Sequence, residues 1–337
     1  MSIVAYRGGK QITDELELQA YLASLLRLEN VGLLLGAGAS CSAGGQTMRT
    51  LWTSFLARNS TKADWLFAQK FITEDEKRLP LPPPPLPPGA VPIPPNPFIP
   101  VPTASLPNFE VLLDRLEIAI LEWERQLSPQ LAEAQEVRTA LFRSVVSAAT
   151  LKEEWWESPL GADLADELRA HRSILQKITA ARQPGQPAPW VFTTNYDLAI
   201  EWAAESVDLQ IINGFLGVHS RRFSPQSFDL GFRNAQAKGE ARFGVYNIYL
   251  AKLHGSLTWK EVDHNLYEVP ASEAWRDIDE FLTGFTDKLS YLVLPRAAKY
   301  LQTVGYVMGE LLRRFAEFMA RPQTALIINL SLIHISD

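Results

Sequence analysis

The chain has 337 residues, of which 47% are hydrophobic, so it can bury a core large enough for one large domain or two ordinary ones. Its net charge of −6 is mild and no long basic block occurs, which argues against direct nucleic-acid binding. Its single cysteine excludes an internal disulfide framework and a structural zinc site built on two or more thiolates. Because the N-terminus lacks a secretory signal and no apolar stretch is long enough to span a membrane, we expect a cytoplasmic globular protein without membrane contact.

A helix and a strand are the first predicted elements. Asp14 and Glu17 favour a helix start. Leucines then recur on one helical face, at Leu18, Leu22, Leu25 and Leu26. The continuous apolar run at 31–35 is typical of a buried strand in a parallel sheet.

The middle of the chain divides into a proline-rich stretch and a helical block. About half of residues 80–107 are proline, so we interpret this stretch as a surface loop, with a ligand for a proline-reading domain as the alternative. Helical spacing returns at residue 108 and persists with interruptions to about 181. We interpret residues 108–181 as a helical subdomain inserted between two strands.

Strands and helices alternate in the rest of the chain. A strand is predicted at 190–194 and a helix at 304–319. Further strands are predicted at 209–212, 248–253, 291–294 and 325–329. This alternation predicts an α/β fold with a doubly wound parallel sheet, to which residues 1–79 and 182–329 contribute. Residues 330–337 form a tail.

Glycines follow the first predicted strand at once. Gly36, Ala37, Gly38 and Ser40 lie in a turn that leads from this strand into a predicted helix. Glycine lets backbone amides approach a pyrophosphate closely, and a helix N-terminus favours its negative charge. Since tight turns also use glycine for steric reasons alone, this turn predicts dinucleotide binding only together with other signals.

Polar side chains stand at the end of the strand predicted at 190–194. Thr194, Asn195 and Asp197 would lie at the carboxyl edge of the sheet, where open parallel sheets bind ligands. Alternatively, Asn195 or Asp197 caps the helix that follows.

A histidine stands at the end of the strand predicted at 248–253. His254, followed by Gly255 and Ser256, would face the same edge, and an imidazole suits proton transfer near neutral pH. His171 in a helical pattern and His264 in a polar loop are interpreted as structural or solvent-exposed, as is His219. Three polar segments at three strand ends are expected to share one cleft.

In their sequence motifs and in the order of these motifs along the chain, these segments resemble the sirtuin family. The stretch 36–49, with Ser40 and Arg49, is similar to the sirtuin nucleotide loop. The segments around Asn195 and His254 resemble those of the catalytic asparagine and histidine. The chain shares two sequence motifs, Thr-Thr-Asn-Tyr-Asp and Leu-His-Gly-Ser, with sirtuin-like NAD hydrolases of bacterial antiphage defence. The resemblance implies a Rossmann-like sheet with an inserted helical subdomain.

The resemblance also implies an activity and the residues that perform it. The expected function is an NAD glycohydrolase that cleaves its substrate NAD to nicotinamide and ADP-ribose, as an abortive-infection effector. Asn195, His254 and Asp197 would be catalytic. The expected nucleotide-binding residues are Gly36, Ala37, Gly38, Ser40, Arg49, Thr194, Gly255 and Ser256. The implied partners are further copies of the chain and a HerA-type helicase or ATPase.

Two other functions stay open beside hydrolysis. One is sirtuin-type protein deacylation or ADP-ribosyl transfer, and the other is a noncatalytic nucleotide sensor or scaffold subunit of a defence complex. Deacylating sirtuins carry a zinc module with four cysteines, whereas Cys41 stands alone here, so no zinc is expected. The chain also has Thr47 and Met48 where these enzymes usually have Asp-Phe. The tail at 330–337 departs from the family pattern too, and is interpreted as truncated or foreign.

Overall fold

The computed structural model describes residues 5–7, 10–78, 106–158, 162, 165–183, 185–232, 247–287, 289 and 303–329. The strands are β1 (Ala5–Arg7), β2 (Lys10–Ile12), β3 (Asn30–Leu35), β4 (Trp190–Thr193), β5 (Gln210–Ile212), β6 (Phe215–Leu216), β7 (Arg221–Phe223), β8 (Asn247–Lys252), β9 (Trp259–Val262), β10 (Asn265–Glu268) and β11 (Thr324–Asn329). The α-helices are α1 (Glu15–Leu25), α2 (Met48–Arg58), α3 (Ser60–Ala68), α4 (Glu74–Lys77), α5 (Phe109–Gln126), α6 (Leu131–Ala149), α7 (Glu154–Glu157), α9 (Arg169–Ala180), α10 (Ala199–Glu205), α11 (Ala271–Leu282) and α12 (Thr303–Met319). The 3-10 helices are η1 (Ala37–Ala43), η2 (Asp166–Leu168) and η3 (Pro225–Asp229).

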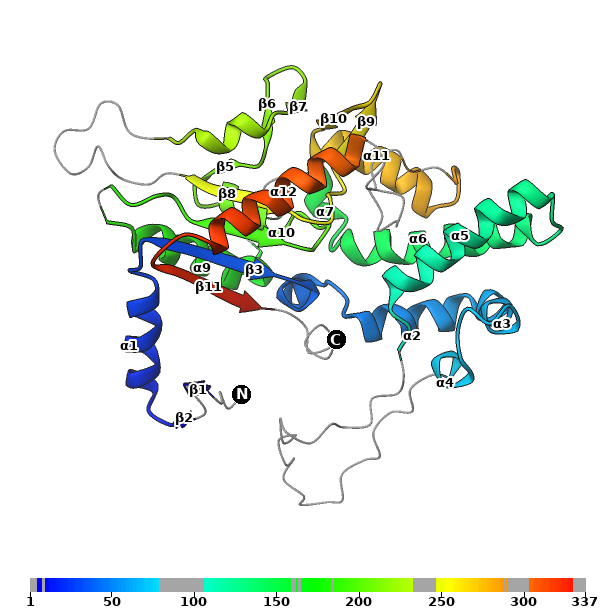
Figure 1. The fold of residues 1–337 in the computed structure, drawn as a ribbon, viewed down its shortest axis with the longest axis horizontal. Helices are drawn as coiled ribbons and strands as arrows, with labels where there is room; N and C mark the ends of the chain where they lie inside the picture. The colour runs from blue at the N-terminus through cyan, green and yellow to red at the C-terminus, as the bar shows by residue number, and fades with distance from the viewer. Residues whose placement is uncertain are drawn as a thin grey trace.

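Five parallel strands form the central sheet, in the order β11-β3-β4-β8-β5 (Figure 1). Each corresponds to a strand that the apolar runs of the sequence predict, so the α/β fold with a parallel sheet is confirmed. The strand predicted at 291–294, the tail at 330–337 and nearly all of the proline-rich stretch lie outside the described residues.

Helices cover both faces of this sheet. Side chains of successive strand residues point to opposite faces, so a continuous apolar run gives the strand an apolar surface on each side. On β4, Trp190 and Phe192 point to one face and pack in a core that includes Phe318 of α12. Val191, between them, packs in the core of the opposite face, which includes Leu175 of α9 and Ile200 of α10. All six of these side chains are buried, so the strands carry apolar residues on both sides and need no alternating pattern.

A second sheet of four antiparallel strands, β6-β7-β10-β9, lies beside the central one and was not predicted. Its strands are two to four residues long. Arg221 of β7 pairs with Glu268 of β10 and donates to Asn213 Oδ1 at 3.1 Å, so this arginine is a structural residue of the sheet.

The helical block between β3 and β4 has a core of its own. Helices α2 and α3, which precede the proline-rich stretch, share this core with α5 and α6, which follow it. Trp52 of α2 is fully buried there and stacks on Phe55, with ring centroids 5.2 Å apart. The helices predicted for residues 108–181 are therefore present, while residues 48–68 pack with them instead of with the sheet. The domain boundaries stay a prediction.

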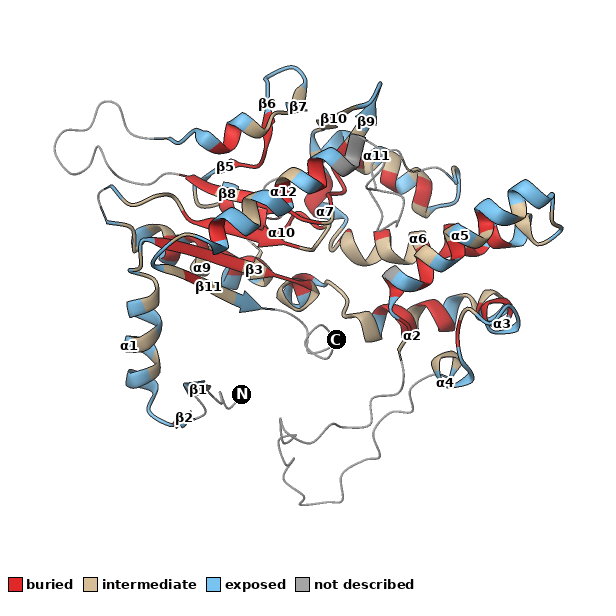
Figure 2. Ribbon diagram, in the orientation of Figure 1, coloured by how far each residue is buried: buried red, intermediate tan, exposed pale blue. Residues whose placement is uncertain are grey.

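A tryptophan cluster joins the helical block to the central sheet. Trp155 and Trp156 of α7 meet Trp202 of α10, with ring centroids 5.4 and 5.5 Å apart. The same buried cluster includes Ala43 at the end of η1 and Leu257, which follows β8. Figure 2 shows buried residues running through the sheet and into the helices at this junction. The cluster thus supports two of the loops at the edge of the sheet.

Helix α1 forms where the leucine spacing predicts it, but most of its face is open. Leu25 and the following Leu26 pack against the sheet core, whereas Leu16 is 72% and Leu22 is 42% exposed. Figure 1 shows α1 extending away from the body of the molecule. No helix among the described residues is long and apolar enough to cross a membrane.

Candidate active site

The carboxyl ends of four parallel strands lie side by side at one edge of the central sheet. The register aligns Asn329, Leu35, Thr193 and Lys252 in one row, and these are the last residues of β11, β3, β4 and β8. Each of the three predicted segments begins at or directly after one of these strand ends. The structure therefore brings all three to one edge, which is where open parallel sheets bind ligands.

The glycine turn connects β3 to the 3-10 helix η1. Gly36 N–H donates to the Asn329 carbonyl, and the Gly36 carbonyl accepts from Ala39 N–H, both at 2.9 Å. The turn thus leads into a helix, as predicted, and this helix is a short 3-10 helix. Gly44 ends this helix with a φ of 96°, a left-handed conformation that glycine adopts without strain.

The Asn195 side chain is anchored to this turn. Its amide nitrogen donates to the Gly36 carbonyl at 3.0 Å and to Ser40 Oγ at 2.8 Å. Because a backbone carbonyl can only accept, the bond to Gly36 fixes which end of the amide is nitrogen. Both amide hydrogens are engaged, so the carbonyl oxygen is the end of Asn195 that can meet a ligand.

Asp197 completes a polar chain that runs from the turn to helix α10. Ser40 Oγ donates to Asp197 Oδ2 at 2.7 Å, and Ala199 N–H donates to Oδ1 at 3.1 Å. Ser40 is 3% and Asp197 8% exposed. Asp197 therefore accepts from the first residue of α10, although the N-cap position itself is Leu198, and the same carboxylate also holds the Ser40 hydroxyl beside Asn195.

The segment that carries His254 lies against the segment that carries Asn195. Leu253 N–H donates to the Thr193 carbonyl at 2.8 Å, and Leu257 N–H donates to the Tyr196 carbonyl at 3.1 Å. His254 lies between these two contacts and is half-buried. The structure thus brings the predicted asparagine and histidine segments together through backbone hydrogen bonds.

The other predicted nucleotide contacts differ in their surroundings. Thr194 N–H donates to the end of β3 at 3.0 Å, and Gly255 takes a left-handed φ of 103°. Ser256 is fully buried, and its hydroxyl lies 3.0 Å from the Thr258 hydroxyl. Arg49 lies in the first turn of α2 and is half-buried. Thr194, Gly255 and Ser256 belong to segments at the sheet edge, but Ser256 faces into the protein.

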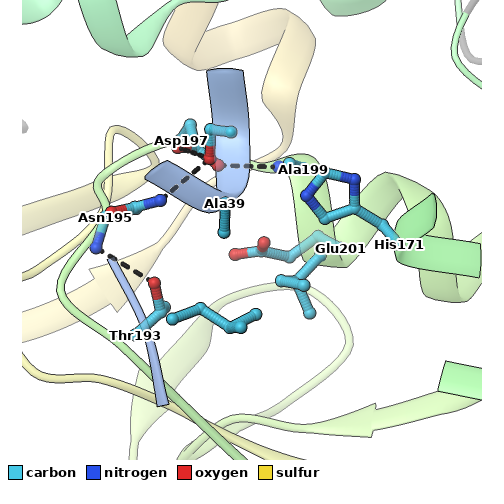
Figure 3. Close-up of a pocket in the computed structure, with 10 residues that line it drawn as sticks. Ala39, His171, Thr193, Asn195, Asp197, Ala199 and Glu201 are labelled. Carbon is cyan, nitrogen blue, oxygen red and sulfur yellow. Dashed lines mark hydrogen bonds between the residues drawn. The ribbon is translucent and has the colours of Figure 1, made fainter. Parts of the chain in front are cut away.

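Asn195 is one of the residues that line a small cavity (Figure 3). Its volume is about 10 Å³, which is room for one water molecule. Its lining consists of Leu35, Ala39, Ser40, His171, Thr193, Asn195, Asp197, Ala199, Ile200 and Glu201. A dinucleotide does not fit inside it. On the glycine turn, Ala37, Gly38 and Ala39 are partly exposed.

His171 of α9 reaches this cavity, although its helical context suggested only a structural or solvent role. It is 5% exposed, and its Nδ1 has no hydrogen-bond partner among the described residues. Burial lowers the pKa of His171, while the charge of Asp197 and a hydrogen bond with the Ala39 backbone oppose that shift. The spacing of His171 with Leu175 and Ile178, both buried, is the signal that placed this imidazole on an inward face.

A buried ion pair that the sequence did not reveal lies beside the cavity. Lys252 Nζ is 2.8 Å from Glu201 Oε1, and the two side chains are 2% and 14% exposed. Burial raises the pKa of the Glu201 carboxyl, and the neighbouring Lys252 ammonium opposes that shift. Polar side chains on strand-end and helix positions therefore extend the site inward from Asn195.

Comparison with known proteins gives no match to any protein-family model and no significant match to a curated protein. Within the described residues, no group of three or more histidine, cysteine, aspartate or glutamate side chains could hold a metal ion. The class that the structure defines is an α/β protein with a five-stranded parallel sheet and a polar cluster at the carboxyl edge of that sheet.

Proposed function

We propose that this protein is an NAD glycohydrolase, which uses water to cleave NAD into nicotinamide and ADP-ribose. The observation that carries the proposal is the double hydrogen bond from Asn195 to Gly36 and Ser40. It joins the predicted catalytic asparagine to the predicted phosphate-binding turn. The segment of His254 lies directly beside the asparagine segment.

The chemistry of NAD cleavage suits such a site. When the bond between nicotinamide and ribose breaks, nicotinamide leaves as a neutral base, because its ring nitrogen already carries the positive charge. No general acid is needed for departure. The site must instead fix the ribose, exclude bulk water and position one water molecule against the oxocarbenium-like carbon.

The residues divide this work between them. The Asn195 carbonyl oxygen orients the attacking water and the ribose hydroxyls, while Ser40 and Asp197 hold the asparagine in place. His254 accepts the proton that the water releases as its oxygen bonds to the ribose carbon. The exposed backbone of the turn around Gly38 meets the pyrophosphate.

The wider biological role belongs to the same proposal. The sequence motifs that the chain shares with sirtuin-like NAD hydrolases support depletion of cellular NAD as an abortive-infection response to phage. They also support a homo-oligomer and a HerA-type ATPase partner. Measuring NAD during phage infection, with wild-type protein and with His254→Ala, tests the defence role.

Nicotinamide release from NAD by the purified protein tests the activity, in the absence of any acylated peptide. His254→Ala should lower turnover about 100- to 10,000-fold, the usual contribution of a general base. His219→Ala is the matched control, because His219 is exposed in the loop between β6 and β7 of the antiparallel sheet and belongs to none of the three segments of the site. Equal turnover of the two variants would refute the role of His254.

Two other results would replace the proposal. Nicotinamide release only when an acylated peptide is added would support deacylation. Binding of NAD without release, unchanged by His254→Ala, would support a noncatalytic sensor.

A further inference from the structure

Lys252, the last residue of β8, is buried although it carries a charge. Its side chain is 2% exposed. Lysine is almost never buried to this degree unless its ammonium is paired, because a charge taken out of water loses its hydration. The contacts of Lys252 therefore indicate what the protein gains from this arrangement.

The ammonium has three acceptors, which matches its three N–H donors. It donates to the Tyr196 carbonyl at 3.3 Å, to the Asp197 carbonyl at a shorter distance, and to Glu201 Oε1 at 2.8 Å. Two of these acceptors belong to the backbone of the loop after β4. The ion pair with Glu201 thus compensates the charge of the Lys252 ammonium, while the two carbonyl contacts fix the position of the loop after β4.

These contacts connect the two segments proposed to act on the substrate. Tyr196 and Asp197 directly follow Asn195, and Lys252 precedes His254 by two positions on the same chain segment. The register of the sheet pairs Thr193 with Lys252, and β4 ends there. Beyond that row, the Lys252 side chain is a direct link from the β8 end to the asparagine loop.

We infer that Lys252 is a positioning residue, which sets the place of Asn195 relative to His254 by clamping the loop between them. The inference rests on the proposed NAD cleavage. A displacement of about 1 Å in a reacting group can reduce turnover about 100-fold, so a clamp of this kind acts on kcat more than on KM.

The test replaces both charges together, in Lys252→Met/Glu201→Gln, so that no lone charge stays buried. Leu250→Ala is the matched control. Leu250 lies on the same strand and is fully buried, so its replacement by alanine destabilises the protein without removing a contact to the loop. The double variant should lose about 100-fold in kcat with little change in KM. The control should lower the melting temperature while kcat changes little.

Hydrogen exchange gives a second readout that does not depend on turnover. The double variant should exchange faster at the Asn195 and Ala199 amides, which bond to the side chains of Thr193 and Asp197, while β3 stays protected. The inference is overturned if wild type releases nicotinamide and the double variant keeps the kcat of the control, or if exchange at these amides is unchanged. Absence of nicotinamide release by wild type overturns the proposed function instead.

Discussion

Ser40 connects the glycine turn, Asn195 and Asp197, so its replacement by alanine should loosen all three. The variant removes one hydrogen bond to a charged carboxylate and one from a neutral amide. Such bonds contribute about 1.5–3 and about 1 kcal/mol. Asp197 keeps its bond from Ala199 N–H and Asn195 keeps its bond to Gly36, so no buried group loses every partner. The free energy of unfolding should fall by about 2.5–4 kcal/mol.

Urea unfolding of Ser40→Ala measures this loss. With a denaturant slope of about 3 kcal/mol per M, the midpoint should shift down by about 1 M. Ser42→Ala is the control, because Ser42 lies in the same 3-10 helix but is exposed, and its effect should stay within about 0.5 kcal/mol. Equal midpoints for the two variants would show that the Ser40 hydrogen bonds make no net contribution to the free energy of unfolding. Ser40 would then not anchor Asn195.

Three further predictions concern backbone packing and pH. Gly45→Ala should destabilise the protein, because the new Cβ would lie 2.8 Å from the Ser40 carbonyl oxygen, whereas Gly309→Ala, on an open face of α12, should stabilise it by about 0.5–1 kcal/mol; thermal unfolding compares them. Gly32→Ala should cost about 1–3 kcal/mol in urea unfolding, because its Cβ would lie 2.7 Å from the ring of Phe318; an unchanged midpoint would contradict this packing. Burial lowers the pKa of His171 below its ordinary 6.5, so the unfolded chain binds more protons and stability should fall as pH drops below about 6.5. His171→Asn should flatten that loss in urea midpoints measured between about pH 5 and 7.5, and a parallel loss in both proteins would count against it.

Much of the central sheet follows from the sequence, because its strands are continuous apolar runs. The run 31–35 is too short for a buried helix and is followed by glycines. The run 190–194 likewise begins with consecutive apolar residues, 190–192, which make both faces of the strand apolar. Parallel pairing then follows from the alternation of strands with helices.

The antiparallel sheet escapes sequence reasoning for physical reasons. Its strand at Arg221–Phe223 is short and begins with two arginines, so no apolar period marks it. The turn between β9 and β10 uses Asp263 and His264, both with positive φ, where a two-residue hairpin usually has Asn-Gly. Tertiary contacts, including the pair of Arg221 with Glu268, determine these strands.

The site is predictable in outline and not in detail. Strand-end placement is sufficient to bring the turn, Asn195 and His254 to one edge. The chain offers no local signal that Lys252 will reach the backbone after Asn195, because that contact spans more than fifty residues and depends on strand register. The spacing of His171 with Leu175 and Ile178 marks an inward face of α9, but the cavity that His171 meets is lined by residues from distant parts of the chain.

The tryptophan cluster has a consequence for how the chain could be shortened. Trp202 on α10 is covered by Trp155 and Trp156 from the helical block, and Leu257 beside the His254 segment is buried in the same cluster. A version of the chain reduced to the sheet and its flanking helices would expose these rings to water and leave Leu257 without its cover. Removal of the helical block would therefore uncover part of the core that supports the edge of the sheet.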